Sequence, residues 1–202
     1  MESSSSSCKK TLLLLILVHF MMPVSAARPL ATDTNTQFIK TSCAITTYPE
    51  LCFSTLSSYA SKIQRKPQLL AKAALSEALK TARSTSSMMS KLSKSQGLGA
   101  GDAEALNDCV EELKDSLDEL QCSIGEMGKQ GHNFRVKLSN IQTWLSAALT
   151  DEDTCMDGFE GNSMNGSIKY SVWGYIVNDA HMISNALALI NNYASTQSLL
   201  HA

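Results

Sequence analysis

The sequence predicts an all-α fold, an up-down-up-down four-helix bundle with an N-terminal disulfide-stapled helical hairpin. Apolar residues recur at alternating steps of four and three along four long segments, which places one apolar stripe on each helix. Short connections that contain glycine separate these segments, and helices joined in this way pack antiparallel. No segment of any length alternates apolar and polar residues with period two, so a sheet is not expected.

Residues 1–27 have the pattern of a secretory signal peptide. Lys9 and Lys10 precede the apolar run Thr11–Met22, and the small residues around Ala26 offer a cleavage site. A run of about 12 apolar residues is too short to cross a bilayer, so a membrane anchor is disfavoured. We therefore expect a secreted protein whose remaining cysteines form disulfides.

Residues 28–202 then form the expected mature chain, a single domain. Lys and Arg fall from 17 to 15 and Asp and Glu from 19 to 18, which leaves a net charge near −3. This balance favours neither nucleic acid nor a membrane as a partner. The sequence has no nucleophile elbow, no phosphate-cradling glycine loop and no metal-ligand spacing, so we expect no catalysis, cofactor or metal site.

The front of the mature chain predicts a loose polar arm over 28–36 and a helical hairpin over 36–60. Pro49 cannot continue the first helix of the hairpin, but its fixed φ suits the first turn of the second. Cys43 and Cys52 lie on either side of this break. They would be roughly 13 Å apart on one continuous helix, but they can meet across a turn. We therefore expect a Cys43–Cys52 disulfide.

The bundle is expected within 67–197, as helices over 67–94, 102–127, about 132–150 and 168–194. The first two stripes are Ala71, Leu75, Ala78, Ala82, Thr85, Met89 and Leu92, then Leu106, Val110, Leu113, Leu117, Leu120, Ile124 and Met127. The other two are Phe134, Leu138, Ile141, Leu145 and Ala148, then Trp173, Ile176, Ala180, Ile183, Leu187, Ile190 and Ala194. Trp173 belongs to a stripe and Trp144 adjoins one, so both are expected in the core.

The spacing of the later cysteines tests the antiparallel pairing of the second and third helices. When the chain folds back near residue 129, Cys109 faces residue 150, which leaves roughly 7 Å of helical rise to Cys155. Cys122 would have to cross roughly 27 Å to reach Cys155, and it lies about 20 Å from Cys109 on the same helix. We therefore expect a Cys109–Cys155 disulfide and a free thiol at Cys122. An idle thiol is favoured over a disulfide-linked dimer.

Charge is divided unevenly between the first two bundle helices. Helix 67–94 is basic and helix 102–127 is acidic. One interpretation is mutual attraction between neighbouring helices, which is worth little for each exposed pair. The other is a negative face that would attract a basic protein partner.

Two isolated polar residues are candidates for other roles. His181 lies one residue after a stripe position, and we interpret it as a flanking residue and not as a catalyst. Asn165 begins the sequon Asn165-Gly166-Ser167 in a predicted loop, so it is a candidate glycosylation site.

Several segments together resemble one known family. The segment Asn140–Phe159, NIQTWLSAALTDEDTCMDGF, is the most specific, and it accompanies an Asp-Cys pair in the acidic helix and a final helix that contains SNALALI. With the signal peptide and the stapled hairpin, these segments resemble the plant pectin methylesterase inhibitor and invertase inhibitor family. The resemblance implies a non-enzymatic apoplastic or cell-wall protein that binds a carbohydrate-modifying enzyme one-to-one. TWLSAALT and the absence of a Pro-Lys-Phe motif favour pectin methylesterase as the target.

The resemblance also implies that inhibition is steric. The faces of helices 67–94, 102–127 and 132–155 would lie across the pectin groove of the enzyme. The candidate contacts are Asp108, Glu111, Glu112, Asp115 and Thr154. The alternatives are an inhibitor of cell-wall or vacuolar acid invertase, and a structural or signalling bundle without an enzyme target.

Overall fold

The fold is described from a computed structural model, for residues 27–128, 133–160 and 166–200. The chain divides into two units, and the boundary falls between Thr34 and Asn35 within helix α2, Ala27–Cys43. The front hairpin and the bundle belong to the second unit. The described residues form helices and no strands, which confirms the predicted all-α fold class.

The front hairpin consists of the end of α2 followed by α3, Pro49–Leu56, η1, Ser57–Tyr59, and α4, Ala60–Ile63. Pro49 occupies the first turn of α3, as the sequence predicted. The predicted loose arm over 28–36 is wrong, because the chain is already helical from Ala27. Neither glycine nor proline occurs between Leu30 and Cys43, so nothing in the backbone interrupts the helix there.

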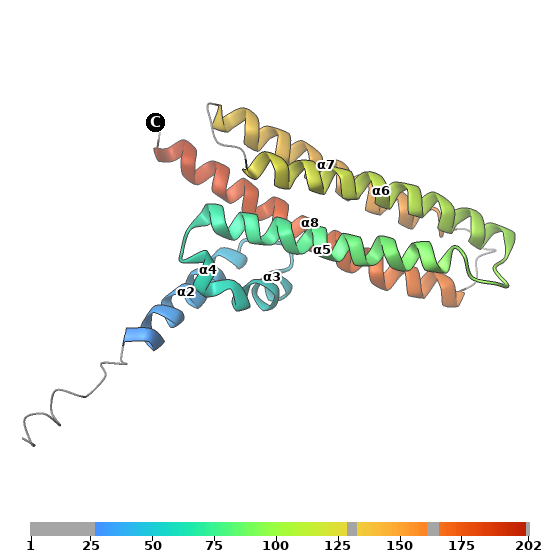
Figure 1. Cartoon of the computed structure of the whole chain (residues 1–202), viewed down its shortest axis with the longest axis horizontal. Helices are drawn as coiled ribbons and strands as arrows, with labels where there is room; N and C mark the ends of the chain where they lie inside the picture. The colour runs from blue at the N-terminus through green and yellow to red at the C-terminus, as the bar shows by residue number, and fades with distance from the viewer. Residues whose placement is uncertain (1–26, 129–132, 161–165, 201–202) are drawn as a thin grey trace, which may run out of the picture. The chain divides into compact units, whose positions relative to one another are not determined.

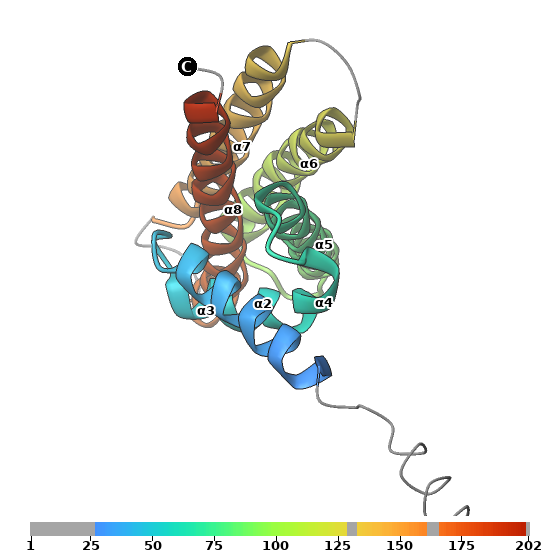
Figure 2. The same cartoon turned by 90° about the vertical axis from the view of Figure 1, so that its left-hand side faces the viewer.

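Four long helices form the bundle: α5, Pro67–Leu92; α6, Ala100–Gly128; α7, Phe134–Asp157; and α8, Gly166–Leu200. Each contacts two neighbours, because α6 lies between α5 and α7, and α8 closes the ring against both of them (Figures 1 and 2). This arrangement confirms the predicted four-helix bundle. The last helix continues six residues beyond the predicted end at Ala194, because no helix-breaking residue follows it.

The predicted stripes face the core, with one exception. Every stripe residue except Trp173 is buried or half-buried. The prediction that Trp173 is a core residue is wrong, since 45% of its surface is exposed. The start of α8 instead buries Val172 and Ile176, and Trp173 lies about 100° further round the helix. Trp144 is half-buried.

The apolar core consists of two clusters. The first joins the front hairpin to the adjoining halves of the four bundle helices, and it contains Leu56, Leu75 and Leu120. The second surrounds the opposite halves and contains Met89 and Phe159. Because both ends of the bundle are packed, the four helices are fixed relative to one another along most of their length.

A layer of polar residues separates the two clusters. We call Thr85, Ser116, Glu152 and Asp179 the polar layer; each comes from a different bundle helix, and each is at most 2% exposed. On each helix, the nearest core residues on the two sides of the layer belong to different clusters. Those in the first cluster are Ala82, Leu120, Ala148 and Ile183, and those in the second are Met89, Leu113, Cys155 and Ile176. Thr85 belongs to a predicted stripe, whereas the other three members of the layer were not predicted.

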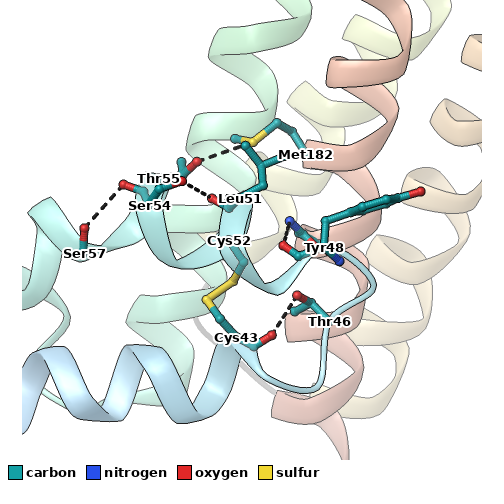
Figure 3. Close-up of a disulfide and its surroundings, with 10 residues drawn as sticks. Cys43, Thr46, Tyr48, Leu51, Cys52, Ser54, Thr55, Ser57 and Met182 are labelled. Carbon is teal, nitrogen blue, oxygen red and sulfur yellow. Dashed lines mark hydrogen bonds between the residues drawn. A yellow bond between two sulfur atoms is a disulfide. The ribbon is translucent and has the colours of Figure 1, made fainter.

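Both predicted disulfides are present. The Cα atoms are 5.6 Å apart in Cys43–Cys52 and 4.3 Å apart in Cys109–Cys155. The first joins the end of α2 to α3, and the Tyr48 side chain at the turn points away from it (Figure 3). Cys122 is an exposed free cysteine on α6.

The turn of the hairpin is fixed to α8 by one side chain. The Tyr48 N–H donates to Asn185 Oδ1 at 3.1 Å, and Asn185 Nδ2 donates to the Tyr48 carbonyl at 3.0 Å. Within the turn, the Thr46 hydroxyl donates to the Cys43 carbonyl at 2.8 Å (Figure 3). The stapled hairpin is therefore held to the bundle by directional bonds as well as by apolar packing.

Candidate functional site

The four acidic candidate contact residues lie along one side of α6, next to α7. The steps from Asp108 to Glu112, Asp115 and Glu119 are four, three and four residues, which places these side chains on one face of the helix. We call this surface the acidic ridge, made of Asp108, Glu111, Glu112, Asp115 and Glu119 of α6 with Asp151 of α7. It contains the four carboxylates that the sequence analysis singled out.

Glu112 lies at the centre of the acidic ridge. The residue is half-buried, and desolvation raises the pKa of its carboxyl group above the ordinary value. The negative charges of Asp151, Asp115, Asp108 and Glu111 raise the pKa further, in that order. The structure therefore brings the predicted carboxylates close enough to act on one another.

Glu119 and Asp151 join α6 to α7 at one end of the ridge. Burial, followed by the charge of Asp151 and a hydrogen bond to it, raises the pKa of Glu119 to about 7. Burial also raises the pKa of Asp151, while the hydrogen bond with Glu119 acts in the opposite direction. The raised pKa of Glu119 favours its protonated form beside Asp151 at acid pH. The ridge therefore holds a proton at acid pH.

Neither Glu119 nor Asp151 is among the predicted contact residues. The spacing from Asp108 through Glu112 and Asp115 would have extended to Glu119 at the next step of four. Asp151 comes from another helix, so only the register of the α6–α7 pair could have indicated it.

The described hydrogen bond of Thr154 does not involve these carboxylates. Its side chain is exposed, and its hydroxyl donates to the Thr150 carbonyl at 2.8 Å within α7. It is three residues after Asp151, hence on the same side of the helix. Its role as a contact stays a prediction.

The basic helix α5 has a described ion pair of its own. Lys80 Nζ lies 3.3 Å from Glu77 Oε2, and the Tyr59 hydroxyl of the front hairpin also donates to Glu77. Glu77 therefore links α5 to the hairpin while it pairs with an exposed lysine. The proposed attraction between α5 and the acidic helix stays a prediction.

His181 lies beside a shallow hollow at the hairpin turn. It is half-buried, its ring stacks on Tyr48 with the centroids 3.5 Å apart, and burial lowers its pKa. The hollow, of about 370 Å³, is lined by Thr47, Tyr48, Pro49, Glu50, Leu51 and His181. The described ring contact of His181 is a packing contact with the hairpin turn.

Two other kinds of feature are absent from the described ranges. These ranges contain no group of three or more His, Cys, Asp or Glu side chains arranged to hold a metal ion. None of the helices within these ranges is both long and apolar enough to cross a membrane. The candidate glycosylation site at Asn165 lies outside the described residues.

Comparisons with known proteins agree with the resemblance seen in the sequence. Residues 37–189 match the family described as plant invertase/pectin methylesterase inhibitor. The chain is 46% identical over 191 residues to the "21 kDa protein" of Daucus carota, covering 93% of this chain and 96% of that one. It is 41% identical over 199 residues to pectinesterase inhibitor 9 of Arabidopsis thaliana, covering 95% and 97%.

The fold has a solved counterpart. A crystal structure of a mutant form of a pectin methylesterase inhibitor from Arabidopsis superposes with a TM-score of 0.62, at 22% identity, over 76% of this chain and 95% of that one. At this identity the superposition supports the fold. The family match and the relatives above supply the rest, and from them we conclude that this chain belongs to the plant invertase/pectin methylesterase inhibitor family.

Proposed function

We propose that this protein is an inhibitor of pectin methylesterase and not an enzyme. It binds the enzyme in a one-to-one complex and covers the pectin-binding cleft, which regulates the methylesterification of cell-wall pectin. The observation that carries the proposal is the 41% identity to pectinesterase inhibitor 9, which extends over 95% of this chain. The family description also names invertase, which is the second candidate target.

The physical basis of the proposed inhibition is a rigid binding surface. Two disulfides and two apolar clusters hold the helices in place, so little conformational entropy is lost when the bundle docks. The acidic ridge supplies carboxylates that can meet basic side chains on the enzyme. Its charge would mainly increase the rate of association and select the partner.

We also propose that the protein acts outside the cell, in the apoplast or cell wall. The signal peptide expected over 1–27 and the disulfides support secretion, because disulfides persist in oxidising compartments. Glycosylation at Asn165 belongs to the same proposal. Analysis of the secreted protein by mass spectrometry would identify both the N-terminus and any attached glycan.

Parallel titrations test the choice of target. The purified mature protein is added to pectin methylesterase and to acid invertase in separate assays. We expect loss of pectin methylesterase activity that saturates near an equal molar ratio, and no loss of invertase activity. The opposite selectivity would replace the target, and no effect on either enzyme would favour a structural or signalling bundle.

Charge reversal tests the acidic ridge as the contact surface. The double variant Glu111→Lys/Glu112→Lys should weaken inhibition at least tenfold, and added salt should weaken inhibition by the unaltered protein. The matched control, Glu50→Lys/Glu160→Lys, makes the same change of charge at two exposed residues outside the ridge. Equal inhibition by both variants would remove the ridge from the contact surface.

A further inference from the structure

The polar layer places two carboxyl groups in the middle of the bundle. Glu152 of α7 and Asp179 of α8 are both 0% exposed, and they lie between the two apolar clusters. The other two bundle helices contribute only hydroxyl groups, from Thr85 and Ser116. Each bundle helix therefore carries one polar side chain in place of an apolar core residue, and the four side chains lie at the same level of the bundle.

The hydrogen bonds in the layer are too few to offset the cost of burying Glu152 and Asp179 as two ionised carboxylates. The Ser116 hydroxyl donates to Glu152 Oε1 at 3.1 Å. Within the described part of the chain, Glu152 Oε2 and both carboxyl oxygens of Asp179 have no hydrogen-bond partner of ordinary geometry. An ionised carboxylate is costly to bury without a cation or several donors.

Among the described residues, the charged groups that act on the layer are acidic. Glu152 is affected by Asp179 of α8 and by Asp151 and Asp153 of its own helix. Facing it, α6 presents the Ser116 hydroxyl, and α5 presents the Thr85 hydroxyl toward Asp179. Like charges at short range disfavour ionisation of both carboxyls, so a proton is the simplest means of neutralising each one.

We propose that the polar layer is a proton-holding element that makes the folded bundle most stable in acid and loosens its middle as the surroundings become alkaline. The pKa shifts have the direction that this requires. Burial, followed by the charge of Asp179, raises the pKa of Glu152, and burial raises the pKa of Asp179, although the Thr85 hydroxyl partly offsets that rise.

The sign of the linkage follows from these directions. The unfolded chain releases both protons near the ordinary carboxyl pKa, whereas the folded chain keeps them to higher pH. Stability is therefore fully present below the ordinary pKa and is lost as the pH rises through the raised values. Between its pKa in the unfolded chain and its pKa in the folded chain, each carboxyl lowers the folding equilibrium constant about tenfold for every unit by which the pH rises.

Neutral variants of the layer test the proposal. Chemical denaturation of the wild type and of Glu152→Gln/Asp179→Asn is compared at pH values from about 5 to about 8. We expect the folding equilibrium constant of the wild type to fall by roughly 100-fold or more over this range, and that of the variant to fall at least tenfold less. A variant with the same pH dependence as the wild type would overturn the proposal.

The acidic ridge provides the matched control. Glu119→Gln/Asp151→Asn removes the carboxyl pair that joins α6 to α7, which is half-buried and lies outside the polar layer. We expect this variant to keep most of the pH dependence of the wild type. If instead it removes the dependence while the layer variant does not, the ridge is the proton-holding element and the proposal is wrong.

Infrared spectroscopy gives a readout that does not require the layer variant to fold. In the Glu119→Gln/Asp151→Asn background at about pH 6, we expect the C=O stretch of a protonated carboxylic acid, which should disappear at alkaline pH. A spectrum with carboxylate bands alone at that pH would overturn the proposal. So would stability that depends on an added divalent cation and not on pH, because the layer would then hold the cation.

Discussion

At the scale of single residues, Asn185 fixes the position of the front hairpin. Its side chain accepts from the Tyr48 N–H and donates to the Tyr48 carbonyl, and only 3% of Asn185 is exposed. Replacing it with alanine leaves both backbone groups of Tyr48 without these partners. An unsatisfied buried polar group costs about 1–3 kcal/mol.

We therefore expect Asn185→Ala to lower the free energy of unfolding by about 2 kcal/mol in urea denaturation. Asn178→Ala is the control, because Asn178 is an exposed asparagine on the same helix. Equal losses of stability in the two variants would show that the bonds to Tyr48 do not hold the hairpin.

Glu119 should influence stability in a pH-dependent manner. Its folded pKa is raised to about 7 from 4.5, so its contribution is present in acid and is lost as the pH rises between these values. Glu119→Gln keeps the shape of the side chain and cannot ionise. At about pH 8 we expect the variant to be more stable than the wild type by roughly 0.5–1 kcal/mol, after allowance for solvent screening.

Thermal denaturation at acid and alkaline pH would measure the effect of Glu119→Gln. The exposed neighbour Asp118, changed to Asn, is the control. A variant at Glu119 that gains nothing at alkaline pH relative to that control would contradict the raised pKa.

The three polar-layer residues that the sequence pattern did not predict, Ser116, Glu152 and Asp179, share one physical feature: they are polar at positions where the helix period favours an apolar residue. The stripe of α7 continues without a break through Leu145, Ala148, Glu152 and Cys155. Glu152 was missed because a glutamate at a stripe position is usually interpreted as the end of the stripe. Asp179 was hidden in the same way, because the apolar Ala180 beside it fitted the expected period. Trp173 was assigned to the core for its apolar character, although the register of α8 turns it outward.

At the scale of elements, the two disulfides should differ in their contributions to stability. Cys43–Cys52 spans a sequence separation of 9 and Cys109–Cys155 a separation of 46. Closing the longer loop removes more entropy from the unfolded chain. In the chain-entropy model, the shorter loop contributes about 3 kcal/mol and the longer about 4 kcal/mol.

We expect Cys109→Ser/Cys155→Ser to lower the free energy of unfolding by more than Cys43→Ser/Cys52→Ser does, with each pair examined by denaturation under oxidising conditions. The Cys122→Ser variant is the control for loss of a thiol without loss of a disulfide. An equal or reversed order would mean that packing around the bridges outweighs the loop entropy.

The order and type of the bundle helices were predictable because each has a long stripe and a glycine-bearing connection. The pairing of Cys109 with Cys155 followed from helical rise alone. The ends of α2 and α8 were not predicted, because polar residues such as those of 28–36 and 195–200 fit a helix surface as well as a loop. The acidic site candidates could be selected in advance because they lie on one helix face, whereas contacts between helices depend on register.

At the scale of the whole molecule, two apolar clusters with a polar layer between them describe the bundle better than a single continuous core. The hairpin adds to one cluster, and the Cys109–Cys155 disulfide lies within the other. The acidic ridge runs along the outer side of the α6–α7 pair, which this disulfide joins. In the proposed complex, the disulfide-bonded pair of helices would form the contact surface.

The dependence of inhibition on pectin concentration tests this account most directly. If the bundle covers the pectin-binding cleft, inhibitor and substrate compete for the same surface. Initial rates of pectin methylesterase should then show an apparent KM that increases with inhibitor concentration and a maximal rate that stays unchanged. A maximal rate that falls at saturating pectin, with KM unchanged, would contradict the proposed covering of the cleft.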